Sequence, residues 1–461
     1  MTAPREPETH RTIDAGVTSA DVFRIALPMT FAYLSTPLLG LVDTAVIGQL
    51  GEAALIGGIA VGALLFDILF STFNFLRSGT TALTAQALGA GHEAEKKAAL
   101  GRALLIALGS GAAMVALQGL LIEAGLLLLA PSAAVAEATR AYYEVRIFSA
   151  PFALANYAIL GWVIGLGRAG VGLGLQTLLN GTNIALSFLF GLHFGWGLFG
   201  VALGTLAGEA LAFAVGIVIC LGIGRGTPWP AAAALLDRAA LLRTAAVNRD
   251  IMIRTFVLLI GFAVFTRVGA RFGDVVLAAN AILMNFFLVG GYFLDGLASA
   301  AEQMTGFAVG ARKRRTFVTA VKLTTAWSFV FAAAVSLFFF LLGGVLIEAM
   351  TTAEEVRAAA LAFLPYAAAT PLAGVLAFEM DGVFIGATWS REMRNMMLAS
   401  LAGYLAILVP ATAVFGNHGL WWSLLAFLLL RGIFLTLSLP ARLAATFPPE
   451  APAPARPGVA R

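Results

Sequence analysis

A single carboxylate, Asp43, stands inside an apolar run that extends from Ile25 to Leu50. A helix over this run is long enough to cross a bilayer of about 30 Å at about 1.5 Å per residue. Because an ionised Asp is costly in lipid, its side chain should face protein or water. Pro28 and Pro37 lie in the same run and favour a bend. Asp43 is therefore predicted to lie on an ion or substrate pathway, and pairing with a buried donor is the alternative.

Further polar side chains occur within apolar spans of the first half of the chain. Asn180, Asn183 and Ser187 recur at i, i+3 and i+7 and therefore line one face of a helix. Their oxygens, beside a carboxylate, could hold a proton network or coordinate a small hard cation. Interhelical hydrogen bonding, which contributes about 0.6 kcal/mol on average in membranes, is an equally good explanation. The same half also contains Asp67, a weaker proton-pathway candidate, together with Asn156, Thr205 and Glu209.

The composition indicates which elements hold these residues. Of the 461 residues, 60% are hydrophobic and 12% are charged. A soluble domain could not cover that much apolar surface, whereas a multi-pass membrane protein exposes it to lipid. The single cysteine, Cys220, excludes an internal disulfide and a cysteine-based metal site. No apolar segment precedes the first span, so no cleavable signal peptide is expected.

Twelve apolar spans are predicted, which makes the fold class an all-α integral membrane protein. We place them at 24–48, 54–76, 98–121, 141–166, 171–192, 196–222, 251–270, 275–298, 317–347, 360–386, 395–415 and 419–440. The predicted parts are an N-terminal tail (1–23), an N-lobe (24–222), a linker with a short interfacial helix (223–250), a C-lobe (251–440) and a disordered tail (441–461).

The distribution of Lys and Arg predicts the orientation in the membrane. With both termini on one side, that side carries most basic residues, including Arg77, Arg254 and the cluster Arg312–Arg315. The other side carries few, among them Arg146. The positive-inside rule then predicts that both termini are cytoplasmic. We interpret the basic cluster as an anchor to anionic lipid rather than a nucleic-acid site.

An internal repeat predicts the architecture. Thr84-Ala-Gln-Ala-Leu-Gly-Ala corresponds to Thr305-Gly-Phe-Ala-Val-Gly-Ala 221 positions later, and Gln49-Leu-Gly-Glu corresponds to Arg271-Phe-Gly-Asp after 222. Two six-helix lobes in the same orientation are therefore expected, related by a pseudo-two-fold axis along the membrane normal. A parallel repeat of this kind is typical of transporters with a substrate site between the lobes near the midplane.

The second half differs chemically from the first. Phe265 stands at the position that matches Asp43. Carboxylates, amides and adaptable side chains are predicted to form an acidic, aromatic lining for a large cation. These substrate-binding candidates are Asp295, Glu302, Asp381, Asn280, Asn285, Tyr292 and Met284. Glu209 and Arg431, which occupy equivalent repeat positions, are expected to form an ion pair between the halves.

Enzyme signatures are missing from the sequence. It contains no Walker P-loop, no H-E-x-x-H and no G-x-S-x-G motif. Without a nucleotide site, an ion gradient is the expected source of energy. A membrane-embedded enzyme is disfavoured because the sequence lacks a constellation of metal ligands or of a nucleophile and its partners.

Several separated motifs resemble the MATE (multidrug and toxic compound extrusion) transporters. The first helix contains Leu41-Val-Asp-Thr-Ala-Val-Ile-Gly, and the tenth contains Asp381-Gly-Val-Phe-Ile-Gly-Ala-Thr. Three other stretches resemble the DinF-like, DNA-damage-inducible branch of that family: Asn248-Arg-Asp-Ile-Met, Arg391-Glu-Met-Arg-Asn and Gly416-Asn-His-Gly-Leu-Trp. The resemblance extends from Ile25 to Leu439.

The resemblance implies a multidrug efflux antiporter in the bacterial inner membrane. Such a protein exports cationic or amphipathic organic compounds by alternating access, in exchange for protons or sodium ions. It implies that the protein uses no cofactor and takes its energy from an ion gradient. We expect a monomer that contacts membrane lipid and binds no nucleic acid. The predicted cation-coupling residues are Asp43, Asn156, Asn183 and Thr205, with Asn180 and Ser187 beside them.

Two alternatives remain within the wider superfamily. One is a sodium-coupled exporter, but Ser187 stands where many family members carry an Asp, and the loss of a carboxylate favours protons. The other is a flippase for lipid-linked oligosaccharides. Twelve spans and an acidic second half argue against the flippase.

Overall fold

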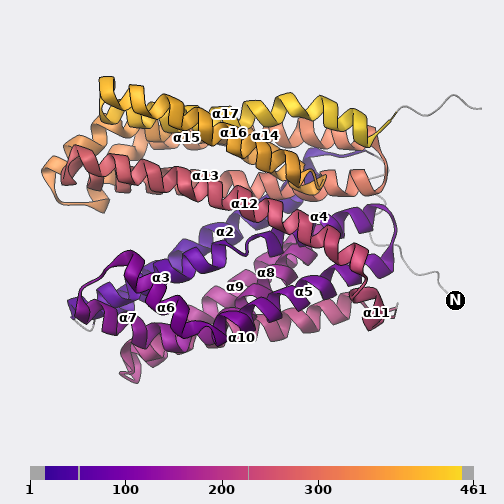
Figure 1. Cartoon of the computed structure of the whole chain (residues 1–461), viewed down its shortest axis with the longest axis horizontal. Coiled ribbons are helices and arrows are strands. Elements are labelled where there is room, and N and C mark those ends of the chain that lie inside the picture. Colours follow the sequence, from indigo (N-terminus) through magenta and orange to yellow (C-terminus); the bar gives the residue numbers. More distant parts are fainter. Residues whose placement is uncertain (1–15, 50–51, 227, 449–461) are drawn as a thin grey trace, which may run out of the picture.

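The computed structural model describes residues 16–49, 52–226 and 228–448. Throughout this part of the chain the regular structure is helical, and the helices run roughly side by side in two bundles (Figure 1). Within it, eleven helices are long and apolar enough to cross a membrane. The remaining predicted span is helical from Ala169 to His193, and three amides reduce its apolar character. The predicted all-α membrane fold is confirmed.

The N-lobe contains the first six predicted spans, several of which are broken. Its helices are α2 (Ser19–Gly48), α3 (Ala53–Ser71), α4 (Phe75–Gly89), α5 (Glu93–Ala116), α6 (Gln118–Leu129), α7 (Ala133–Arg146), η1 (Ile147–Ser149), α8 (Ala150–Gly165), α9 (Ala169–Leu186), the π-helical η2 (Ser187–His193) and α10 (Gly197–Ile223).

The C-lobe is built from longer, less interrupted helices. They are α12 (Arg238–Gly269), η3 (Ala270–Phe272), α13 (Asp274–Gly310), α14 (Arg314–Met350), α15 (Glu354–Gly386), α16 (Ser390–Phe415) and α17 (Asn417–Thr446). Between the lobes, the short α11 (Ala232–Leu235) is tied to α5 by a bond from Arg102 Nη2 to the Ala234 carbonyl, at 3.1 Å.

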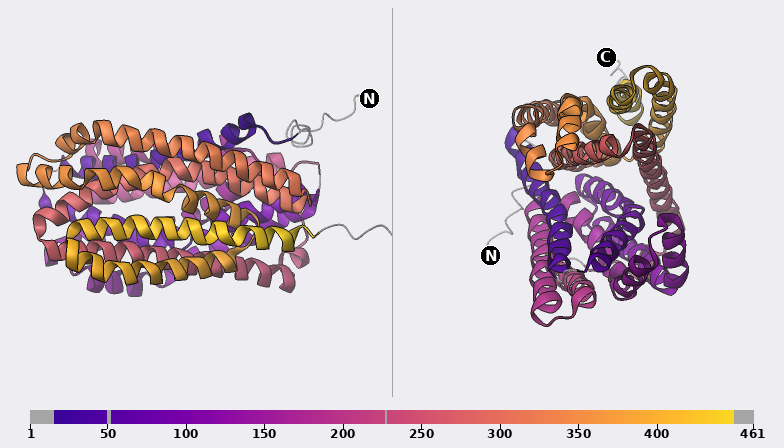
Figure 2. Two further views of the ribbon diagram at one scale, coloured as in Figure 1. Left: turned by 90° about the horizontal axis from the view of Figure 1, so that it is seen from above. Right: turned by 90° about the vertical axis from the view of Figure 1, so that its left-hand side faces the viewer.

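Several helices continue past the predicted apolar spans. α12 begins at Arg238, inside the segment 223–250 that we expected to be a linker. α17 ends at Thr446, so residues 441–446 are helical rather than part of a tail. Both ends of the described chain lie at one end of the bundles, which we call the terminal end; the opposite one is the distal end (Figures 1 and 2). The outermost tail residues, 1–15 and 449–461, lie outside the described part.

A reciprocal helix crossing joins the lobes at the terminal end. A Cβ on Gly89 would overlap the backbone carbonyl of Phe307, and a Cβ on Gly310 would overlap that of Gln86. Gly89 and Gly310 are 221 positions apart, and so are Gln86 and Phe307. The repeated motif therefore packs against its own copy, and the small residues allow the two backbones to approach. Equivalent positions of the two repeats thus contact each other, as a two-fold relation between the lobes requires.

Side-chain hydrogen bonds reinforce this junction. Gln86 Nε2 donates to the Gly386 carbonyl at 2.9 Å, and Trp327 Nε1 donates to Ser19 Oγ at 3.0 Å. Nearer the middle of the bundles, the Tyr33 hydroxyl lies 2.9 Å from Ser299 Oγ. Towards the distal end, the ribbons of the two lobes diverge (Figure 1).

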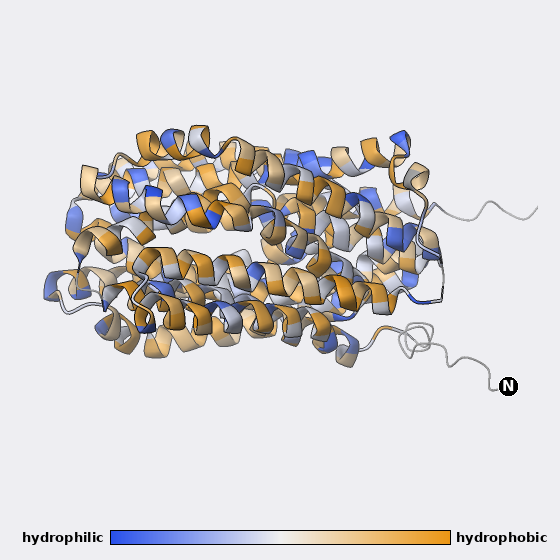
Figure 3. Ribbon diagram, turned by 90° about the horizontal axis from the view of Figure 1, so that it is seen from below, coloured by the Kyte–Doolittle hydropathy of each residue, from blue (hydrophilic) through white to orange (hydrophobic). Residues whose placement is uncertain are grey.

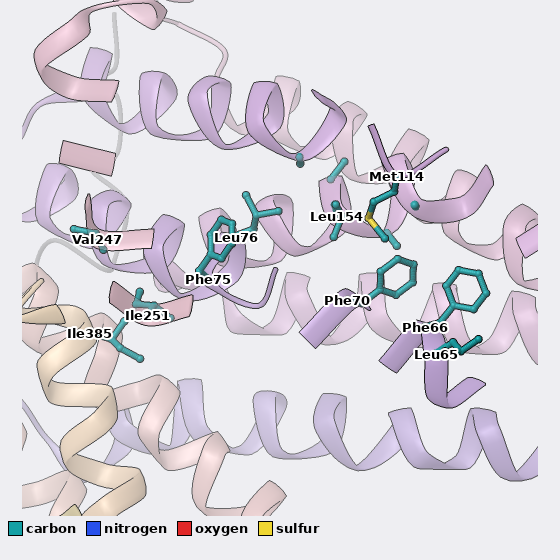
Figure 4. Packing of buried hydrophobic residues seen from close by; sticks show 14 of the residues in the cluster. Leu65, Phe66, Phe70, Phe75, Leu76, Met114, Leu154, Val247, Ile251 and Ile385 are labelled. Carbon is teal, nitrogen blue, oxygen red and sulfur yellow. The ribbon is translucent and has the colours of Figure 1, made fainter. Parts of the chain in front are cut away.

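Hydrophobic residues make up most of the helices in both bundles (Figure 3), and many large apolar side chains are exposed. Leu127 is 85% exposed and Leu437 is 72% exposed, as expected of side chains that face lipid rather than water. The interior of the N-lobe is packed with large apolar residues. Phe66 and Phe70 lie close to Met114, with Leu65 beside them (Figure 4). This packed interior surrounds the polar residues described next.

Candidate functional site

The structure brings three of the predicted coupling residues together in the distal half of the N-lobe. Asp43 on α2 is 6% exposed, and the Ser187 hydroxyl lies within hydrogen-bonding reach of its carboxylate. Ser187 Oγ also donates to Asn183 Oδ1 at 3.0 Å. Asp43 Oδ1 and Asn183 Nδ2 are both buried without a hydrogen-bond partner. A buried carboxylate with a free acceptor is a group that can take up a proton or a small cation.

Local backbone structure positions this group. The α-helical winding of α9 changes to π-helical at Ser187, a rare geometry that is frequent at functional sites. Gly204 of α10 packs directly on this turn, since a Cβ there would lie 2.8 Å from the Ser187 nitrogen. Thr205, next to this contact, is buried, but its hydroxyl donates to the carbonyl of Val201 in its own helix at 3.2 Å.

Two predicted coupling residues make other contacts. Asn180 Nδ2 donates to Ser35 Oγ at 2.7 Å and so links α9 to α2. Asn156 Nδ2 donates to Glu209 Oε2 at 2.7 Å and links α8 to α10. The predicted ion pair between Glu209 and Arg431 is therefore wrong, because each side chain is held inside its own lobe.

Sequence reasoning missed the role of Arg146. The distribution of basic residues predicts a position at one membrane surface, but its helix starts at Ala133, where Ser132 caps it. The guanidinium donates to the Tyr142 hydroxyl at 2.6 Å and lies 4.6 Å from the centre of the Phe66 ring. Its positive charge acts on both Asp43 and Asp67. The cap at Ser132 was the signal that could have placed Arg146 inside the lobe.

The carboxylates of the C-lobe are matched by arginines. Asp381 is ion-paired with both Arg254 and Arg431, the latter at 2.8 Å. Glu302 lies 3.7 Å from Arg77, which comes from α4 of the other lobe.

Asp295 is half-buried, and the charges of Arg77, Arg254 and Arg431 act on it. The expected excess of negative charge in this lining is therefore wrong: three carboxylates face three guanidinium groups. The error arose because Arg77 and Arg254 were assigned to the cytoplasmic surface, although α4 and α12 carry them inwards.

The other predicted substrate-binding residues lie in different surroundings and do not form one group with this charged cluster. Asn280 exchanges hydrogen bonds with Asn417 at 2.8 and 3.0 Å and accepts another from Trp421 Nε1 at 2.9 Å. Asn285 is exposed and donates to the Ala281 carbonyl of its own helix at 2.9 Å. Tyr292 is half-buried and interacts electrostatically with Asp295. Met284 is also half-buried and packs against the apolar core of the C-lobe.

Glu379, also noted in the sequence, is held apart from that cluster. It is 1% exposed and accepts hydrogen bonds from two hydroxyls of α14, those of Thr324 and of Ser328, the second at 2.9 Å. Both carboxylate oxygens thus accept a hydrogen bond. We interpret these two bonds as structural, because they hold α15 against α14.

Comparisons with known proteins identify the family. The MatE family model matches residues 28–189 and 251–411, one match in each lobe. The DNA damage-inducible protein F of Escherichia coli (strain K12) is 37% identical over 434 residues, which are 91% of this chain and 92% of that protein. A probable multidrug resistance protein NorM of Deinococcus radiodurans is 30% identical, over 90% of this chain and 93% of that protein.

The fold is also that of solved transporters. The crystal structure of the Vibrio cholerae MATE transporter VcmN in the bent form matches with a TM-score of 0.85 and 21% identity, over 93% of this chain and 97% of that one. At that identity the likeness supports the fold alone. Together with the two family matches, it confirms the resemblance seen in the sequence. The chain belongs to the MatE family, whose members are secondary membrane transporters and not enzymes.

Proposed function

We propose that this protein exports cationic or amphipathic organic compounds in exchange for protons. The single observation that carries the proposal is the buried Asp43 carboxylate, which has one oxygen without a partner inside an apolar lobe. Relatives named as multidrug resistance proteins support drugs as the class of substrate. We place the protein in a bacterial inner membrane as a monomer, with both termini in the cytoplasm.

Protonation of Asp43 is the coupling step. It removes a negative charge beside Arg146, whose positive charge also acts on Asp67. Arg146 then interacts more strongly with Asp67, and the contact between α2 and the turn at Ser187 is altered. A proton shifts such an equilibrium only by its different affinity for the two states, and a desolvated carboxylate supplies that difference.

Helix α2 can transmit this change. Its terminal half packs against α13 of the C-lobe, with Thr30 close to Gly296. Asp43 lies in the distal half, beyond Pro37, which removes a backbone hydrogen bond and weakens the helix locally. A bend at Pro37 therefore moves the part of α2 that carries Asp43 while the part that holds the lobes together stays in place.

We propose that, with cytoplasmic termini, the junction around Gly89 and Gly310 closes the cytoplasmic side in this arrangement and that the path to the outside opens at the distal end. In this state a proton from outside reaches Asp43 and an exported compound leaves. The reverse state requires that the junction around Gly89 and Gly310 separates. Export then follows from alternation between the two arrangements.

Sodium coupling and lipid flipping are the competing functions. Asn183 Oδ1 and Ser187 Oγ are hard oxygen ligands that sodium would accept. Arg77, Arg254 and Arg431 could bind a lipid pyrophosphate, but each of them already faces a carboxylate. The balanced charge of this cluster therefore offers a pyrophosphate no excess of positive charge.

A binding experiment separates export of cations from lipid flipping. We expect purified protein in detergent to bind ethidium, a permanent organic cation, and to show no competition from a short-chain prenyl pyrophosphate. Fluorescence titration with each ligand alone and in mixture measures this. Tight pyrophosphate binding that displaces the dye would instead indicate a flippase.

A further inference from the structure

A second carboxylate, Asp67, lies in the middle of the broken span formed by α3 and α4. It is among the exposed residues of α3, although its helix is otherwise strongly apolar. Exposure of a carboxylate to lipid at this depth is costly. The Asp67 charge also acts at longer range on Tyr292 of α13, in the other lobe, and on Tyr157 of α8. The Asp67 carboxylate therefore lies within electrostatic range of side chains from both lobes.

Asp67 differs from most other intramembrane carboxylates in its partners. It differs from Asp295, which also lacks an ion pair within the described residues, because Asp67 is exposed and feels one arginine rather than three. Asp381 and Glu302 form ion pairs with arginines, and Glu209 accepts a hydrogen bond from Asn156. Within the described ranges, no hydrogen bond or ion pair is recorded for Asp67. Arg146 acts on it through longer-range attraction, and the Arg146 guanidinium donates a hydrogen bond to Tyr142.

The surroundings of Asp67 favour a particular ligand chemistry. An exposed, unpaired carboxylate attracts a positive charge. The rings of Tyr292 and Tyr157 can contact an apolar body and add cation–π attraction. A permanent organic cation with aromatic groups meets both requirements, whereas an anion of the same shape meets only the second.

We propose that Asp67 is the recognition site for the positive charge of the exported compound, separate from the coupling residue Asp43. This inference rests on the proposed export of organic cations. The division of roles follows from accessibility: Asp43 is 6% exposed and suited to a proton, whereas Asp67 is open to a larger ligand. Arg146 links the two, because its charge acts on both carboxylates.

Two ions of the same shape and opposite charge test the assignment. Tetraphenylphosphonium is the cation and tetraphenylborate the anion. We expect Asp67→Asn to raise the Kd for tetraphenylphosphonium by about tenfold and to leave that for tetraphenylborate unchanged or lower. Isothermal titration calorimetry on purified full-length protein measures both. Asp67→Glu, which keeps the charge, should restore binding, and Asp274→Asn is the matched control, since Asp274 is exposed at the start of α13.

The outcomes separate this inference from the function on which it rests. An unchanged Kd for tetraphenylphosphonium in Asp67→Asn would overturn the role of Asp67 alone. Equal weakening of both ions would also overturn it, because a structural defect does not distinguish charge. Failure of the wild-type protein to bind tetraphenylphosphonium would overturn the proposed function together with this inference.

Discussion

Replacement of Asp43 by Asn is expected to abolish transport of a cationic dye against its concentration gradient. The substitution keeps the size and one carbonyl oxygen of the side chain but removes the group that can gain and lose a proton. The two arrangements of the lobes then no longer differ in proton affinity at this position, and a proton gradient cannot drive their exchange. Net uphill transport should fall to the level of protein-free vesicles.

Binding should survive the same substitution. Asp43 is buried within the N-lobe, apart from the proposed recognition site, so the Kd for ethidium should stay close to that of the wild type. Asp274→Asn, at an exposed carboxylate, should retain both binding and transport. Loss of dye binding together with transport in Asp43→Asn would show that Asp43 contacts the substrate, contrary to its proposed role.

Substitution of Gly310 by Ala is expected to have the second largest effect. A Cβ at this position overlaps the backbone carbonyl of Gln86. Unlike a side chain, this carbonyl cannot rotate away from the added methyl group. Overpacking of this kind costs about 1–3 kcal/mol. The proposed transport cycle requires this junction to separate in the opposite arrangement, so the cost should shift the population towards that arrangement by about tenfold or more.

Distance measurements between spin labels detect that shift. Labels on His92 of the N-lobe and Arg391 of the C-lobe, both exposed, should move apart in Gly310→Ala, and the transport rate should fall at least about tenfold. Gly109→Ala is the control, because nothing lies within 4 Å of a Cβ there. Unchanged label distances in the Gly310 variant would mean that the glycine crossing does not control closure.

The architecture was predictable because it depends on signals that repeat along the chain. Twelve apolar spans require a membrane, and the constant offset between repeated motifs requires two lobes of the same orientation. The crossing of Gly89 and Gly310 shows why the motif is repeated: each copy packs on the other. The burial of Asp43 was predictable for a different reason, since a carboxylate in an apolar helix must be sheltered from lipid.

The charge balance of the C-lobe was not predictable in the same way. Hydropathy locates an apolar run but not how far the helix continues past it, so Arg77 and Arg254 were placed at a membrane surface. Their pairing with Glu302 and Asp381 joins residues more than a hundred positions apart, which spacing along one helix does not reveal. The amide of Asn280 is likewise occupied by Asn417, which is 137 positions away.

Dye export from proteoliposomes under an imposed gradient tests the central claim, proton coupling at Asp43, most directly. Wild-type protein, Asp43→Asn and Asp274→Asn are each measured with an inward gradient of protons alone and then of sodium alone. The account predicts uphill export by wild type and Asp274→Asn with protons, none with sodium, and none by Asp43→Asn with either ion. Export that follows sodium alone, or proton-driven export that persists in Asp43→Asn, would contradict it.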